Sequence, residues 1–162
     1  MAVSDPVTRP ARPAFLQPGL LALVMVGGAV GTAARWQLSQ AFTPEPEHWP
    51  WVTFTINVVG SFLLGLLLET LLRSSPDAGW RRGIRVGVGT GLLGGFTTYS
   101  TFIVETDRLV ASGHLWVGSA YAVVSILVGV LTALGGIALA RTIRPSRVTR
   151  TRLIDPVVSD AS

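Results

Sequence analysis

The stretch GGFTTYSTF, residues 94–102, decides how this chain folds. It lies inside the apolar run Val86 to Val104, which is long enough to cross a bilayer. A glycine pair followed by a run of hydroxyl-bearing residues is unfavourable in a plain lipid-facing helix, since glycine costs about 1 kcal/mol per residue in a helix interior. Irregular backbone at membrane depth is tolerated only where protein buries it or a watery cavity borders it. The stretch therefore predicts a break in a membrane helix, with freed carbonyl groups available to an ion.

The composition is typical of a membrane protein. Of the 162 residues, 49% are hydrophobic and 14% are charged, whereas a soluble domain carries roughly 25% charged residues. Cysteine is absent, so the sequence predicts no disulfide and no cysteine-based metal site. The net charge of +4 is carried by arginine without lysine, and we interpret it as a determinant of membrane topology, not as a nucleic-acid surface. No catalytic dyad, triad or nucleotide-binding glycine loop is visible, so the sequence does not predict an enzyme.

Four apolar segments have the length of a membrane span, which is about 17–25 residues. They cover residues 19–38, 51–72, 83–104 and 115–140. The sequence therefore predicts an all-α membrane protein with four transmembrane helices in residues 19–141, the third of them broken at Gly94–Thr98. Residues 1–18 predict a disordered N-terminal tail, and residues 142–162 a polar, loose C-terminal tail. A signal peptide is an alternative for the first segment, because Arg9 and Arg12 precede its apolar core.

Glycines recur at a spacing of four residues on two of these segments. The third segment carries them at positions 83, 87, 91 and 95, and the first segment carries Gly27 and Gly31. This spacing places small residues on one helix face and permits close helix packing, either within a subunit or between subunits.

Polar residues also recur at helical spacing. Asn57, Ser61 and Gly65 share one face of the second segment. On the fourth segment, Tyr121 and Ser125 are followed by Gly129 and Thr132 on or near one face. Single residues of this kind are often simple contacts between membrane helices. Together with the hydroxyls of residues 97–101, they form candidate walls of a narrow polar path that suits a small ion.

In these same segments the chain resembles the Fluc-type fluoride channels, also called the CrcB family. The resemblance rests on GGAVGTAAR at residues 27–35, TFTINVVGSF at residues 53–62 and GGFTTYSTF at residues 94–102, followed by Glu105. It extends over roughly residues 27–141. The order of these motifs on a chain of this length makes the resemblance specific.

The resemblance implies an antiparallel dimer with two pores. It also implies a structural sodium ion at the dimer interface, held by the backbone carbonyl groups of Gly94 and Thr97. Carbonyl oxygens freed from a helix are suitable ligands for a small, hard cation. Arg35 matches the first-helix arginine of the family, and Glu105 matches its third-helix carboxylate.

The resemblance further implies which residues border the fluoride path. Aromatic ring edges, which carry positive partial charge, fall at two positions of the break motif. The first position is usually Phe in this family and is Tyr here, so its added hydroxyl predicts an altered conductance. The expected path residues are Asn57, Tyr99, Phe102, Tyr121 and Ser125, with the hydroxyls of Thr98, Ser100 and Thr101.

Arginine is distributed unequally between the two predicted sides of the membrane. The side that holds both termini carries eleven arginines, whereas the opposite side carries Arg108, and Arg35 is embedded. The positive-inside rule then predicts one orientation in the plasma membrane, with both termini cytoplasmic. An antiparallel dimer would need an oppositely oriented paralogous subunit, and a homodimer is the alternative.

The function implied by the resemblance is passive export of cytoplasmic fluoride, which lowers its toxicity. Two alternatives remain open at this point. A small multidrug-type proton-coupled transporter would need a central carboxylate as proton carrier, but Glu69 and Glu105 lie near helix ends. A non-conducting partner subunit of a heterodimeric channel is the other alternative.

Overall fold

The computed structural model describes residues 17–42, 48–74 and 78–143, and within these ranges the chain is helical with no strand. The helices are α1 (Pro18–Ala41), α2 (Trp51–Ser74), α3 (Gly79–Ile84), the π-helix η2 (Arg85–Leu93), α4 (Gly94–Phe96), α5 (Ser100–Ala111) and α6 (Leu115–Thr142). The all-α prediction is confirmed. Residues 1–16 and 144–162, which make up nearly all of the two predicted tails, lie outside the described residues.

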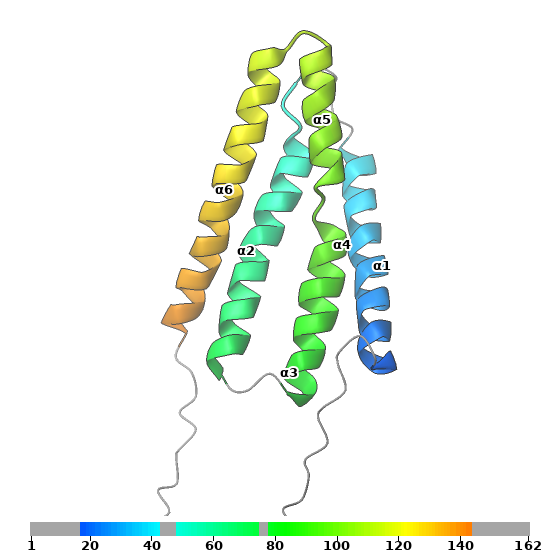
Figure 1. Ribbon diagram of the computed structural model, residues 1–162, viewed down its shortest axis with the longest axis vertical. Coiled ribbons are helices and arrows are strands. Elements are labelled where there is room, and N and C mark those ends of the chain that lie inside the picture. The colour runs from blue at the N-terminus through cyan, green and yellow to red at the C-terminus, as the bar shows by residue number, and fades with distance from the viewer. Residues whose placement is uncertain (1–16, 43–47, 75–77, 144–162) are drawn as a thin grey trace, which may run out of the picture.

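Three of these helices are long and apolar enough to cross a membrane: α1, residues Trp51–Arg73 of α2, and α6. Most of α6 is exposed, and its buried residues are Gly118, Tyr121, Gly136 and Ala140. An apolar helix with so little burial needs lipid or another protein around it. The first segment forms a full-length helix packed against η2 (Figure 1), which favours a retained helix over a signal peptide.

The third apolar segment is interrupted, as the sequence predicts, but at a different residue. Gly94 and Gly95 are still helical, α4 ends at Phe96, and the helix resumes at Ser100. Thr97 has extended backbone angles of φ −75° and ψ 158°. The predicted start of the break at Gly94 is therefore wrong by three residues. The physical reason for this difference is that Gly95 lies in a close contact between helices. A Cβ at Gly95 would lie 2.5 Å from the carbonyl oxygen of Gly28 in α1.

The glycine pattern is used inside the chain, between α1 and η2. A Cβ at Gly31 or Gly27 would overlap backbone atoms of Leu92 or Gly87, and a Cβ at Gly91 would lie 2.9 Å from the Val24 carbonyl oxygen. These glycines therefore let two helix backbones touch. The π-helical winding of Arg85–Leu93, which the sequence did not predict, occurs along this same contact.

Helix α2 packs along α6 on the other side of the molecule (Figure 1), again through glycines. Gly65 contacts Ala133, and Gly136 contacts Phe62. A hydrophobic core forms nearer one end, where Phe102, Leu109 and Tyr121 are buried together, with Trp49 and Phe54 packed against them. The interrupted segment thus packs closely against α1 on one side. On its other side are α2 and α6, and α2 packs less closely against η2 and α4 than α1 does.

Candidate functional site

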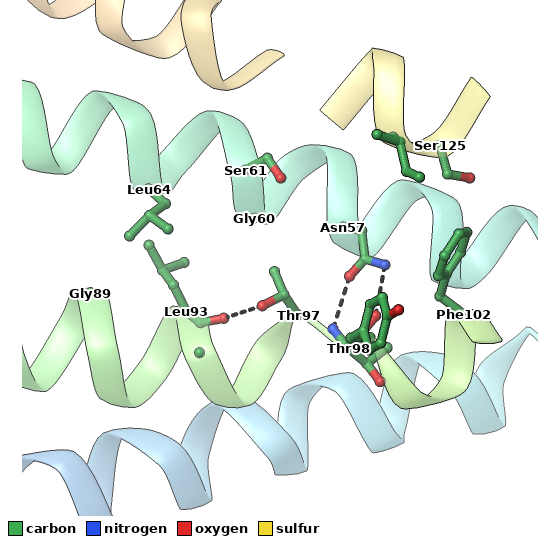
Figure 2. A pocket seen from close by; sticks show the side chains of 13 residues that line it. Asn57, Gly60, Ser61, Leu64, Gly89, Leu93, Thr97, Thr98, Phe102 and Ser125 are labelled. Carbon is green, nitrogen blue, oxygen red and sulfur yellow. Dashed lines mark hydrogen bonds between the residues drawn. The ribbon is translucent and has the colours of Figure 1, made fainter. Parts of the chain in front are cut away.

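A groove of about 340 Å³ runs beside the break. Its walls come from α2, η2, α4, the break itself, α5 and α6, as Figure 2 shows. Apolar atoms contribute most of the surface, and the polar groups concentrate near the break. The polar lining residues are Asn57, Ser61, Thr97, Thr98, Tyr99 and Ser125.

Asn57 of α2 holds the interrupted backbone. Its Nδ2 donates to the Thr98 carbonyl oxygen at 2.9 Å, and its Oδ1 accepts from the Thr98 N–H at 2.9 Å (Figure 2). One side-chain amide thus replaces both partners that a backbone would have supplied to Thr98. Such replacement is required because an unsatisfied backbone group in an apolar medium costs several kcal/mol, on the order of a lost hydrogen bond or more.

Thr98 also supplies hydrogen bonds to the start of the next helix, α5, which begins at Ser100. Its Oγ1 accepts from the Thr101 N–H at 3.2 Å and donates to Thr101 Oγ1 at 3.0 Å, while Ser100 Oγ lies 3.3 Å away. This arrangement satisfies an N–H of the first turn, as an N-cap does. Ser100 and Thr101 are outside the groove lining. The structure thus places these predicted path hydroxyls in the cap of α5.

At the break, the carbonyl groups of Gly94 and Thr97 lose the N–H groups that would bond to them in a continuous helix. In a continuous helix, the carbonyl of Gly94 would accept from the Thr98 N–H, and that of Thr97 from the Thr101 N–H. Both N–H groups bond to side chains instead. The last regular bond is the one from the Thr97 N–H to the Leu93 carbonyl oxygen, at 3.0 Å. Gly94 is exposed, and no atom lies within 4 Å of the position of a Cβ there.

The Gly95 carbonyl oxygen, between these two, accepts from side chains of α1. Arg35 Nε lies 3.3 Å from it and Thr32 Oγ1 lies 3.4 Å from it. A cation at the C-terminal end of a helix is favourable, because the last carbonyl groups carry partial negative charge. Arg35 therefore hydrogen-bonds to the C-terminal end of the helix that precedes the break. It is not one of the groove-lining residues.

Glu105 joins three helices beyond the groove. Its Oε1 accepts from Thr53 Oγ1 of α2 at 2.7 Å, and its Oε2 accepts from the Tyr121 hydroxyl of α6 at 2.9 Å. Thr53 and Tyr121 are buried. The Tyr121 hydroxyl, predicted for the path, is thus bound to Glu105. Sequence reasoning missed Thr53, although its position four residues before Asn57 places both on one face of α2.

The two aromatic residues of the motif both line the groove, but they differ in burial. Tyr99 is 76% exposed and Phe102 is 6% exposed. Their ring centroids are 6.1 Å apart, and Phe102 in turn lies 5.3 Å from the ring of Tyr121. Phe102 is therefore held in the core, whereas Tyr99 stands at an open edge of the groove.

Of the hydroxyl-bearing residues predicted on one face of α6, Ser125 lines the groove. Ser125 Oγ is buried, with no hydrogen-bond partner in the described part of the chain. Thr132 Oγ1 bonds to the Val128 and Gly129 carbonyl oxygens of its own helix, at 2.9 and 3.1 Å. Thr132 therefore does not line the groove. The serine hydroxyls that line it are those of Ser125 and of Ser61 in α2.

The fold is that of a small all-helical protein with three helices long and apolar enough to cross a membrane, and a groove lies beside its helix break. The chain belongs to the CrcB family, because the family model described as "CrcB-like protein, Camphor Resistance (CrcB)" matches residues 22–137. A fluoride-specific ion channel FluC 2 of Leifsonia xyli subsp. xyli is 48% identical over 131 residues, which are 81% of this chain and 90% of that protein.

Two further relatives carry similar names. A fluoride-specific ion channel FluC 1 of Mycobacterium bovis is 46% identical over 127 residues, 78% of this chain and 94% of that protein. A fluoride-specific ion channel FluC 1 of Cutibacterium acnes is 44% identical over 131 residues, 81% of this chain and 92% of that protein. The family predicted from the motifs is thereby confirmed.

Proposed function

We propose that this chain is a subunit of a fluoride-selective channel through which cytoplasmic fluoride leaves the cell passively. The observation that carries the proposal is Ser125 Oγ, a buried hydroxyl on the wall of the groove that has no hydrogen-bond partner among the described residues. A buried polar group without a partner is costly, and a permeating anion would accept its hydrogen bond. The names of the relatives support fluoride as that anion.

The groove has the chemistry that dehydration of a small anion requires. Selective conduction needs fixed groups that replace the hydration shell of the ion. Hydroxyl donors come from Ser61 and Ser125, and positively polarised ring edges come from Tyr99 and Phe102. The Asn57 amide is occupied by Thr98, so its contribution would be to hold the wall in place.

A structural sodium ion at the break is part of the proposal. The donor set fits, because the carbonyl groups of Gly94 and Thr97 have lost their helical donors to Asn57 and Thr98. Carbonyl oxygens suit small, hard cations. Gly94 stands at an exposed surface, where the same groups of a second subunit would complete the coordination. When bound, the ion would supply positive charge that links the two subunits.

We also propose four membrane crossings and an antiparallel dimer with an oppositely oriented paralogous subunit, with a homodimer as the alternative. The interrupted segment from α3 to α5 runs alongside the three continuous helices (Figure 1), which supports a fourth crossing. Both termini would be cytoplasmic. Arginines in the described residues gather at the shared end of α2, α3 and α6, namely Arg73, Arg81, Arg82, Arg85 and Arg141.

The environments of the carboxylates favour a channel over a proton-coupled transporter. Glu105 accepts two hydroxyl hydrogen bonds. Glu69 lies near the end of α2, where Arg141 Nε is 3.0 Å and Arg73 Nε is 3.9 Å from its Oε1. A proton carrier has to exchange with water from both sides, whereas both of these carboxylates are already held by partners.

Fluoride efflux from liposomes, recorded with a fluoride electrode, tests the proposal. The purified chain is reconstituted alone and together with a paralogous subunit. We expect fluoride efflux without chloride efflux, and we expect the paralogue to increase it. Full efflux by the chain alone would contradict an obligate heterodimer, and no efflux in either preparation would contradict the channel itself. With the paralogue present, a loss of efflux on Ser125→Ala in this chain would show that this chain is a conducting subunit. Unchanged efflux would indicate a non-conducting subunit.

A further inference from the structure

Four of the five arginines at the shared end of α2, α3 and α6 fall into two groups with different surroundings; the fifth, Arg85, is the first residue of η2. Arg141 and Arg73 approach Glu69, and Arg73 Nη1 also donates to the Arg141 carbonyl oxygen at 3.2 Å. This first group joins the ends of α2 and α6. The second group, Arg81 and Arg82, lies in α3, at the start of the interrupted segment.

Arg81 and Arg82 each keep an unused donor. Arg81 Nη1 and Arg82 Nε are buried, with no hydrogen-bond partner in the part of the chain that the structure describes. A guanidinium group offers five N–H donors and no acceptor, so an anion is the natural complement. Leaving a buried charged donor without a partner is costlier than leaving a neutral one. Each of the two side chains therefore has one donor that the described part of the chain leaves available to an anionic ligand.

An exposed tryptophan adjoins this pair. Trp80 is 69% exposed, and the Arg81 guanidinium carbon lies 5.3 Å from the centre of its ring. Tryptophan is enriched at the level of lipid headgroups, where its ring is amphipathic. In Figure 1, α3 lies at the end of the molecule where α2 and α6 also end. Arg81 and Arg82 thus lie at the expected depth of headgroup phosphates.

We propose that Arg81, Arg82 and Trp80 form a binding site for the phosphate group of an anionic phospholipid. Guanidinium groups bind phosphate through paired, charge-assisted hydrogen bonds. Basic clusters immediately outside a membrane span bind anionic headgroups in the same way. The site is separate from the groove and does not depend on which ion the groove conducts.

Lipid binding to the purified full-length protein, measured by native mass spectrometry in detergent, tests the proposal without involving membrane orientation. The probes are phosphatidylglycerol, phosphatidylcholine and inorganic phosphate. The wild type is expected to prefer phosphatidylglycerol to phosphatidylcholine. Each of Arg81→Gln and Arg82→Gln is expected to weaken phosphatidylglycerol binding about fivefold, in line with the contribution of one arginine near an anionic surface.

Arg141→Gln is the matched control, because it removes the same charge from the same end but from the group that pairs with Glu69. We expect it to leave the preference for phosphatidylglycerol unchanged. Arg82→Lys keeps the charge and should retain part of the binding. An equal loss in Arg141→Gln and Arg81→Gln would overturn the proposal, since it would reduce the effect to general charge. Equal binding of inorganic phosphate would overturn the assignment to a lipid.

Discussion

The two contacts of the interrupted segment are built in opposite ways. On the α1 side, glycines remove side chains so that backbones touch, as Gly31 does against Leu92 and Gly95 against Gly28. On the α2 side, a polar side chain replaces backbone, as Asn57 does for Thr98. The first contact tolerates no added atoms, whereas the second tolerates no lost hydrogen-bonding groups. The comparison shows how one helix can be packed closely on one face and bordered by a groove with polar groups near the break on the other.

The largest effect is expected where the backbones touch. Gly31→Ala places a methyl group onto backbone atoms of Leu92 and Phe96, which cannot move as a side-chain end would. We expect destabilisation of at least about 3 kcal/mol, at the upper end of overpacking costs, measured by thermal unfolding and by monodispersity in detergent. The control is Gly135→Ala, because no atom lies within 4 Å of a Cβ there. A stable Gly31→Ala protein would disprove the close contact between α1 and η2.

The next effect concerns the α2 side. Asn57→Ala leaves both the N–H and the carbonyl of Thr98 without partners, at a cost of about 1–3 kcal/mol for each group. We expect lower thermal stability and at least about tenfold slower fluoride efflux, because the wall of the groove relaxes. Asn57→Asp is the sharper variant, since it keeps the acceptor for the Thr98 N–H and removes the donor. Wild-type stability in Asn57→Ala would show that the break holds its shape without this amide.

Ser125→Ala separates function from stability. Its Oγ has no hydrogen-bond partner in the described residues, so its removal should leave the midpoint of thermal unfolding unchanged or slightly higher. Fluoride efflux should fall about tenfold, which corresponds to ~1.4 kcal/mol for one lost donor. Ser119→Ala, at an exposed position of the same helix, should change neither quantity. Equal efflux from the two variants would remove Ser125 from the path.

The smallest effect is expected at the open edge of the groove. Tyr99→Phe removes a hydroxyl from a ring that is 76% exposed and keeps its approach to Phe102. The sequence alone predicts an altered conductance from this hydroxyl, but its exposure leads us to expect fluoride efflux within about twofold of the wild type. We also expect unchanged stability, since surface substitutions usually stay within about 0.5 kcal/mol. Single-channel or liposome flux recordings would detect a larger change, which would mean that the Tyr99 hydroxyl takes part in conduction.

The site residues illustrate how far a sequence pattern reaches. Spacing by four residues predicted that Asn57 and Ser61 share one face of a helix, because a regular helix repeats its faces, and both residues line the groove. The same rule did not distinguish Ser125, whose hydroxyl borders the groove, from Tyr121, whose hydroxyl is bound by Glu105. The spacing of residues along a helix predicts which face a residue lies on. Whether its polar group is free to border the groove depends on the hydrogen-bond partners that neighbouring helices supply.

The sequence by itself determined the family, the apolar segments and the presence of a break, because these follow from composition, run length and the local cost of glycine and hydroxyl residues. The tertiary structure decided that the break begins at Thr97, since Gly95 is needed helical against α1. It also decided that Asn57 would supply the missing backbone partners of Thr98. Both outcomes depend on contacts between residues more than forty positions apart, and local preference carries no information about such contacts.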